Sequence, residues 1–245
     1  MEMPSEHMKR QGNYVRLSET VVNSDRWSLL EEKVTDFEND KLITSRQRRV
    51  LLELLCALRT EYDSIIHDYY NNIYVSRSLL AWRARNLLEI NTWCRFCCVD
   101  IKNADLLFKW AAEDQLELET QFEKWAENTD QLTEYSERIE RVRQDVLNQA
   151  DKRGVFDLEA KYKSPFEAAK SFGFEQDFKI HNKILSKYAH PTPMLLLSKE
   201  LGDGMSKRQF YFFSQGCLFF YDAFSRLEQL FDNIEMGGLE VQSLK

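Results

Sequence analysis

Residues 76–99 read Ser76-Arg-Ser-Leu-Leu-Ala-Trp-Arg-Ala-Arg-Asn-Leu-Leu-Glu-Ile-Asn-Thr-Trp-Cys-Arg-Phe-Cys-Cys-Val99. When these residues are placed at 100° intervals around a helix axis, the apolar ones fall on all sides. A helix that is apolar on all sides lies in the interior of its protein. We therefore expect residues 76–99 to form a central, buried helix.

A second stretch, residues 206–234, is dense in aromatic residues. Aromatic side chains at helical spacing are typical of a protein core and rarely mark a cofactor site. The 245-residue chain also has only eight glycines and four prolines, too few for the many turns of a β-rich protein. The sequence therefore predicts an all-α protein, a single multi-helix bundle with two central buried helices. The aromatic residues of the second helix are Phe210, Tyr211, Phe212, Phe213, Phe219, Phe220, Tyr221, Phe224 and Phe231.

The helical pattern outlines one domain. We expect a flexible N-terminal lead over residues 1–26, the helical domain over 27–235 and a frayed tail over 236–245. Periodic apolar residues predict further helices within the domain, and Thr44 or Ser45 is placed to cap the second of them. These helices cover roughly residues 27–37, 45–73, 105–128, 129–151 and 175–188.

Charge is distributed unevenly along the chain, whose formal net charge is −7. Residues 111–152 hold 12 acidic and 5 basic residues, so this segment carries the whole excess and the rest of the chain is neutral. Residues 105–151 have apolar positions about 3.5 residues apart with charged residues between them, which predicts a protruding acidic helical hairpin. Such a hairpin is either an ordinary solvated helix pair or a dimerisation arm.

Several classes of protein are disfavoured by what the sequence lacks. No apolar run reaches the roughly 18 residues of a membrane span and no secretory signal opens the chain, so we expect a cytoplasmic protein without membrane contact. The five cysteines, an odd number, favour reduced thiols. There is no His-Glu-x-x-His, no Glu-x-x-His and no glycine-rich phosphate loop. We therefore expect neither a metal site nor a cofactor.

The stretch Lys183-Ile-Leu-Ser-Lys-Tyr-Ala-His-Pro-Thr-Pro193 carries the candidate site. The proline that follows His190 disfavours the helical conformation at this histidine, so the helix ends there. The macrodipole at a helix C-terminus favours the charged form of the imidazole. On the helix, Lys183, Ser186 and Lys187 share one face, and His190 follows one turn later.

These residue types suit phosphate chemistry. Metal-free RNA cleavage needs a group that titrates near neutral pH and a cation that stabilises the pentavalent phosphate. We assign His190, Lys183 and Ser186 as catalytic residues, and Lys187 and Tyr188 as substrate-binding residues. In the competing interpretation, His190 is a helix cap beside two solvated lysines.

Three charged residues, Arg83, Arg85 and Glu89, interrupt the apolar pattern of the central helix. An unpaired buried charge strongly destabilises a fold, so these residues need partners. We expect Glu89 to pair with Arg85 or Arg83, and Tyr188 or His190 to lie close to this polar cluster.

Two motifs resemble known families. Arg85-Asn-Leu-Leu-Glu89 is an Arg-x-x-x-Glu motif, and Ser186-Lys-Tyr-Ala-His190 is a Ser-x-x-x-His motif. The pair is similar to a bacterial all-helical family known only as a domain of unknown function. More remotely it resembles the HEPN class (higher eukaryotes and prokaryotes nucleotide-binding), which is built around Arg-x(4–6)-His. Here Lys183 has six residues between it and His190 and stands in place of that arginine, without its bidentate fork.

The HEPN resemblance implies an RNA- or nucleotide-directed protein, a metal-free endoribonuclease of the toxin or defence type that acts as a dimer. The alternative is a non-enzymatic module for protein interaction or oligomerisation. In that case the acidic hairpin recognises a protein partner or a second copy of the chain. The apolar positions Leu132, Ile139, Val142 and Val146 are then expected to form the contact.

Overall fold

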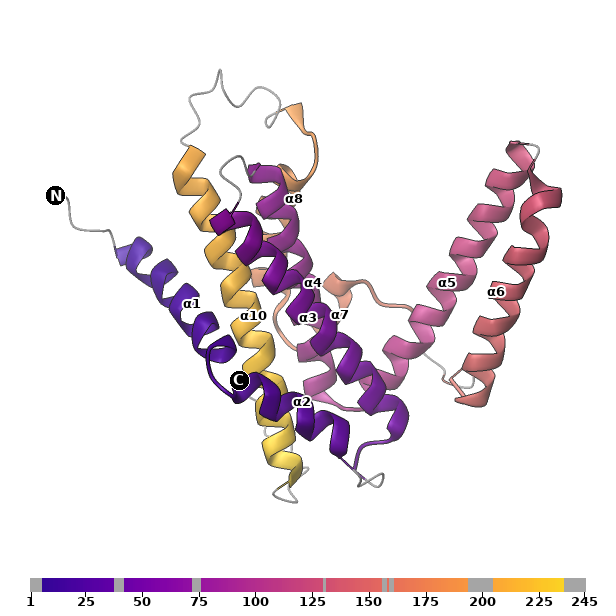
Figure 1. Ribbon diagram of the computed structural model, residues 1–245, viewed down its shortest axis with the longest axis horizontal. Helices are drawn as coiled ribbons and strands as arrows, with labels where there is room; N and C mark the ends of the chain where they lie inside the picture. The colour runs from indigo at the N-terminus through magenta and orange to yellow at the C-terminus, as the bar shows by residue number, and fades with distance from the viewer. Residues whose placement is uncertain are drawn as a thin grey trace.

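The computed structural model describes residues 6–37, 42–71, 76–129, 131–155, 158, 161–193 and 205–235; the expected tail over 236–245 lies outside these ranges. In the described residues every regular element is an α-helix and no strand occurs, which confirms the all-α prediction (Figure 1). None of the described helices is both long enough and apolar enough to cross a membrane. The helices are α1 (Glu6–Val22), α2 (Arg26–Asp36), α3 (Ser45–Asn71), α4 (Arg77–Val99), α5 (Asn103–Asn128), α6 (Leu132–Lys152), α7 (Pro165–Ser171), α8 (Glu175–Ala189) and α10 (Met205–Glu235).

Helix α4 lies at the centre of the bundle. It packs against α10, α8, α3 and α7, and α10 in turn packs against α1, α2 and α3. The interface between the two central helices combines aliphatic residues of α4 with aromatic residues of α10. Leu80, Leu87, Phe213 and Phe220 all have no exposed surface. The prediction of two central buried helices is therefore confirmed.

Gly216 allows α10 to approach α3 and α4 closely. A Cβ atom at this position would lie 2.6 Å from Ile65 Cδ1 and 3.1 Å from Leu87 Cδ1. Both distances are shorter than ordinary van der Waals contacts, so any larger residue would displace its neighbours. The single glycine inside the aromatic helix thus has a packing role.

A partly buried polar network also joins α4 to α10. Asp222 Oδ2 accepts hydrogen bonds from Arg95 Nε at 2.7 Å and from Asn91 Nδ2 at 3.0 Å, and Arg226 Nε lies 3.1 Å away. Burial alone would raise the pKa of Asp222, but Arg95, Arg226 and the Asn91 hydrogen bond outweigh it and hold the pKa below its usual value. Sequence reasoning missed this network because Arg95 and Asp222 are 127 residues apart.

Side-chain caps determine where α3 and α4 begin. Thr44 Oγ1 accepts the backbone N–H of Gln47 at 3.2 Å, and Gln47 Oε1 accepts the backbone N–H of Thr44 at 3.0 Å. This reciprocal pair satisfies N–H groups that have no partner inside the helix. Ser76 Oγ likewise accepts the backbone N–H of Leu79 at 3.1 Å. Of the two capping candidates for α3, Thr44 is therefore the one that caps.

The N-terminal segment differs from the flexible lead expected over residues 1–26. Residues 6–22 form α1, which packs against α10. Its covered side includes the polar residues Gln11 and Ser18, both buried. Tyr62 on α3 donates a hydrogen bond to Ser18 Oγ at 3.1 Å. Because part of the buried stripe is polar, apolar periodicity alone did not reveal this helix.

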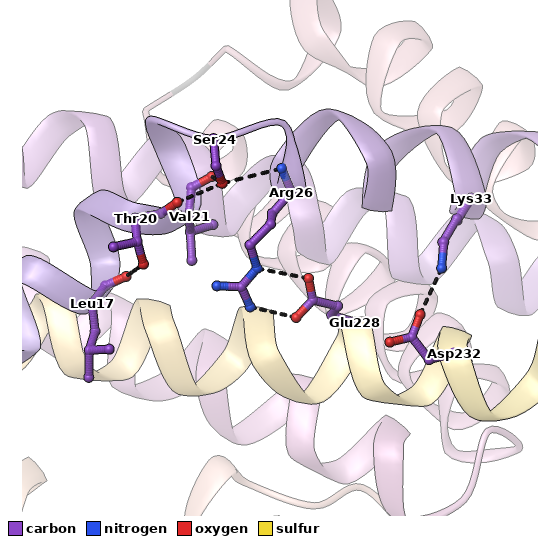
Figure 2. Close-up of polar contacts among 8 residues, drawn as sticks. All are labelled: Leu17, Thr20, Val21, Ser24, Arg26, Lys33, Glu228 and Asp232. Atoms are coloured by element: carbon purple, nitrogen blue, oxygen red, sulfur yellow. Dashed lines mark hydrogen bonds and ion pairs between the residues drawn. The ribbon is translucent and has the colours of Figure 1, made fainter.

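Ion pairs hold α2 along α10 (Figure 2). Arg26 Nε and Nη2 donate to the two carboxylate oxygens of Glu228, at 3.0 and 2.5 Å. Further along, Lys33 Nζ lies 2.7 Å from Asp232 Oδ1. In the corner between α1 and α2, Ser24 Oγ accepts the backbone N–H of Arg26 at 3.4 Å. The hydrogen bond with Glu228 is the main reason that the pKa of Arg26 is raised.

Helices α5 and α6 form a hairpin that projects from the bundle (Figure 1). Its base is tied to α3 through Asp105, whose carboxylate accepts hydrogen bonds from Arg46 and, at 2.8 Å, from Gln47. Within the hairpin, Arg143 Nη2 on α6 donates to Glu123 Oε2 on α5 at 3.0 Å. The protruding hairpin predicted over residues 105–151 is present as these two helices.

Candidate functional site

Helix α8 ends where the sequence predicted. Ala189 is its last residue, and His190 follows in an extended conformation, with φ −105° and ψ 151°. The His190 backbone N–H still donates to the Ser186 carbonyl at 3.3 Å, while Thr192 Oγ1 donates to the Lys187 carbonyl at 3.0 Å. These bonds satisfy backbone carbonyls at the end of the helix. They hold the imidazole at a defined corner of the bundle.

At this corner the two sequence motifs meet. Arg85 Nη1 on α4 lies 3.3 Å from His190 Nε2, although the two residues are 105 positions apart. The same guanidinium donates through Nε to Asn182 Oδ1 at 3.2 Å and forms an ion pair between Nη2 and Glu89 Oε1 at 2.9 Å. Glu89 therefore pairs with Arg85 and His190 lies near them, as expected, but the pair is partly exposed, at 31% and 29%, and not inside the bundle. We call Arg85, Glu89, Asn182 and His190 the corner network.

Ser186 joins the corner network through Asn182. Its hydroxyl donates to Asn182 Oδ1 at 3.3 Å, so this amide oxygen accepts from both Ser186 and Arg85. Sequence reasoning did not single out Asn182. Its signal was present, because residues 182, 186 and 190 follow a spacing of four and share one helix face.

The imidazole of His190 is exposed to solvent and lies beside a group that can only donate hydrogen bonds. A guanidinium has only donors, so Nε2 is the acceptor in a hydrogen bond between the two side chains.

Arg85 has capacity for a further ligand. Arginine has five N–H groups, and the contacts of the three guanidinium nitrogens with described residues use three of them, so at most two N–H groups remain for a ligand. The side chain is 29% exposed. An anion approaching from solvent can therefore reach the guanidinium beside His190, and a phosphate matches its planar donors.

The predicted lysines lie on the solvent side of α8. Lys183 and Lys187 are both exposed, and their side chains make no hydrogen bond or ion pair within the described residues. They add positive charge close to the corner network without belonging to it. Tyr188 points the other way: it is buried, packs against Phe212 with ring centroids 4.9 Å apart, and accepts a hydrogen bond from Arg208. The structure thus places the Tyr188 ring in the core, with its hydroxyl on the exposed side chain of Arg208.

Arg83, the other residue expected as a partner of Glu89, pairs instead with carboxylates on α3. Its Nη1 and Nε lie 3.2 Å from Glu61 and 3.2 Å from Asp68, both on α3. It therefore links α3 to α4, and Glu89 pairs with Arg85 alone of the two candidates. The other histidine on α8, His181, packs edge-to-face against Phe219 at 5.3 Å, and burial lowers its pKa.

The function of this chain has to be inferred from its own residues. No protein-family model, no curated protein and no solved structure matches the chain significantly. Within the described residues, no three His, Cys, Asp or Glu side chains form a group suited to a metal ion. What this corner offers is a cationic group, an imidazole and two accessible lysines, a set that suits a phosphate.

Proposed function

We propose that the protein binds RNA at the corner network and cleaves its phosphodiester bond without a metal ion. The observation that carries this proposal is the contact between Arg85 Nη1 and His190 Nε2 at 3.3 Å. It brings together the two groups that metal-free RNA cleavage needs, a fixed cation and an imidazole. In the proposed likeness to the HEPN class, Arg85 on α4 would take the part of the arginine that position 183 lacks.

Binding begins with the phosphate. A phosphate can accept from Nη1 and Nη2 of Arg85, the nitrogens that also contact His190 and Glu89. Lys183 and Lys187 on the exposed side of α8 attract neighbouring phosphates as point charges. This attraction is local, since the chain as a whole has a net charge of −7. Non-specific binding to long nucleic acids is accordingly weak.

His190 then acts on the ribose. A phosphate that engages Arg85 competes with the imidazole for the guanidinium and releases Nε2, which takes the proton of the 2′-hydroxyl. The 2′-oxygen forms a bond to phosphorus, the bond from phosphorus to the 5′-oxygen breaks, and the leaving oxygen takes a proton from the imidazolium or from water. The products are a 2′,3′-cyclic phosphate and a 5′-hydroxyl. Arg85 stabilises the charge that develops on the phosphate oxygens.

The other members of the corner network position these two groups. Glu89 and Asn182 hold opposite sides of the Arg85 guanidinium, and Ser186 orients the Asn182 amide. With Nε held by Asn182 and Nη2 by Glu89, the plane of the guanidinium keeps one orientation when the phosphate displaces His190. A fixed donor plane lowers the reorganisation needed in the transition state.

The test is cleavage of a mixture of end-labelled RNA oligonucleotides by the purified protein in the presence of EDTA. We expect products ending in 2′,3′-cyclic phosphate and no cleavage of the same sequences as DNA. His190→Ala should lower the rate by about 100-fold or more, the usual effect of removing a general acid or base. His67→Ala is the matched control, because His67 on α3 is a solvent-exposed histidine far from α8 in sequence. The proposal would be contradicted if His190→Ala cleaved RNA at the native rate. It would also be contradicted if EDTA abolished cleavage by the native protein.

A further inference from the structure

A groove runs between α5 and α6 in the half of the hairpin formed by the end of α5 and the start of α6. It has a volume of about 300 Å³, and most of its lining is apolar. Trp125 and Tyr135 face each other across it edge-to-face, with centroids 5.7 Å apart. The lining includes Phe122, Ile139 and Val142. The groove thus lies on the part of the molecule that projects from the bundle.

The α5 side of the groove is an exposed apolar stripe. Leu118, Phe122 and Trp125 are 46%, 47% and 47% exposed. Their spacing of four and three residues aligns them on one face of the helix over about 10 Å. Isolated exposed apolar side chains are ordinary, but an aligned stripe beside a groove is typical of an interaction site.

The hairpin that carries the groove is acidic, since residues 111–152 hold 12 acidic and 5 basic residues. In the lining itself, the charged side chains are those of Glu119 on α5 and Arg138 on α6. Glu134 is exposed and precedes Tyr135, so it adds acidic charge beside the groove. A partner that binds here therefore meets an apolar groove on an acidic arm.

We propose that this groove binds a basic amphipathic helix of a partner protein. The apolar face of such a helix would fill the groove, as in other helix-in-groove complexes, and its lysines or arginines would meet the surrounding carboxylates. A second copy of this hairpin is a poorer occupant, because face-to-face packing of two acidic grooves juxtaposes like charges. This inference does not depend on RNA cleavage at the corner network.

The probe is a synthetic peptide of about 18 residues, long enough for five helical turns. It carries leucine at helical positions i, i+3, i+4 and i+7 and lysine elsewhere, and a twin peptide replaces every lysine by glutamate. Binding of each labelled peptide to the full chain is measured by fluorescence anisotropy. We expect the lysine peptide to bind more tightly than the glutamate twin, and added salt to weaken this binding.

Two kinds of variant locate the site. Trp125→Ser should weaken binding of the lysine peptide by about 10-fold or more, as for a buried aromatic contact residue. Ile180→Ser, on α8 and 55% exposed, is the matched control that should leave binding unchanged. The double change Glu119→Gln and Glu134→Gln should weaken binding, whereas Glu31→Gln with Glu32→Gln on α2 should not. If Trp125→Ser loses helicity by circular dichroism, Phe122→Ser replaces it.

Three results would overturn the inference. One is equal binding of the lysine peptide and its glutamate twin; another is full binding by both Trp125→Ser and Phe122→Ser. The third is self-association of the chain that Trp125→Ser abolishes in sedimentation experiments, which would make a second copy the occupant. Measuring RNA cleavage and peptide binding on both variants separates the two proposals. Trp125→Ser should leave the cleavage rate unchanged, and His190→Ala should leave peptide binding unchanged.

Discussion

Glu89 Oε1 lies 2.9 Å from Arg85 Nη2, and the two side chains are 31% and 29% exposed. The pair is therefore partly solvated, and it joins residues one turn apart on the same helix. Its direct contribution to stability is small for that reason, because water already solvates part of both charges. Its larger effect is on geometry, since it holds one side of the guanidinium that also contacts His190.

We predict that Glu89→Gln lowers the free energy of unfolding by about 1 kcal/mol or less, as expected for a partly exposed ion pair. Urea denaturation followed by circular dichroism measures this change. A loss of about 3 kcal/mol or more, the range for breaking a buried pair, would show that the charges are less solvated than the structure indicates.

Arg85→Lys should damage RNA cleavage more than Lys183→Ala does. Lysine keeps the charge but has no planar fork, so it cannot contact Asn182, Glu89 and His190 together. We expect kcat to fall by about 100-fold, as on removal of an oxyanion donor. Lys183 is exposed outside the corner network, so Lys183→Ala should act mainly on KM. The control is Arg49→Lys, because Arg49 forms an exposed ion pair with Glu53. Equal kcat values for Arg85→Lys and Arg49→Lys would refute the role of Arg85.

Asp222 should make stability depend on pH in the acid range. Its pKa in the folded protein is lower than the ordinary value of 3.8, so its contribution is complete above that pH and is lost as the pH falls below it. We predict that Asp222→Asn lowers the free energy of unfolding at pH 7 by about 2 kcal/mol, because Arg95, whose side chain is 19% exposed, then loses a charge-assisted hydrogen bond and its counter-charge. The variant should also lose less stability than the native chain between pH 4 and pH 2. Equal stability of the two proteins at pH 7 would count against the partly buried network.

Two glycines in helices should respond to alanine in opposite ways. A Cβ at Gly12 in α1 meets no atom within 4 Å, so Gly12→Ala should stabilise the protein by up to about 1 kcal/mol through helix propensity. A Cβ at Gly216 would lie 2.6 Å from Ile65 Cδ1. The steric overpacking should destabilise the protein by about 1–3 kcal/mol, which exceeds the gain in helix propensity. Thermal melting of both variants tests this, and a rise in Tm for Gly216→Ala would mean that the core relaxes around the added methyl.

The sequence by itself determined the helical architecture. The burial of α4 follows from apolar residues on all its sides, and the density of aromatic residues identifies α10, because both signals arise within one helix. The end of α8 at His190 was predictable in the same way, since the proline after it acts on its immediate neighbour. Helix α1 was missed because its buried stripe contains Gln11 and Ser18, which apolar periodicity does not count.

Only the tertiary structure decided which side chains meet. Arg85 had Glu89 as a partner within its own helix, but its contacts with Asn182 and His190 depend on how α4 lies against α8. Because of the same packing, Tyr188 is buried in the core and Lys183 is exposed to solvent, although both belong to one short polar stretch. A helical period specifies which residues share a face. The direction of that face is set by the neighbouring helices, through contacts between residues that are far apart in the chain.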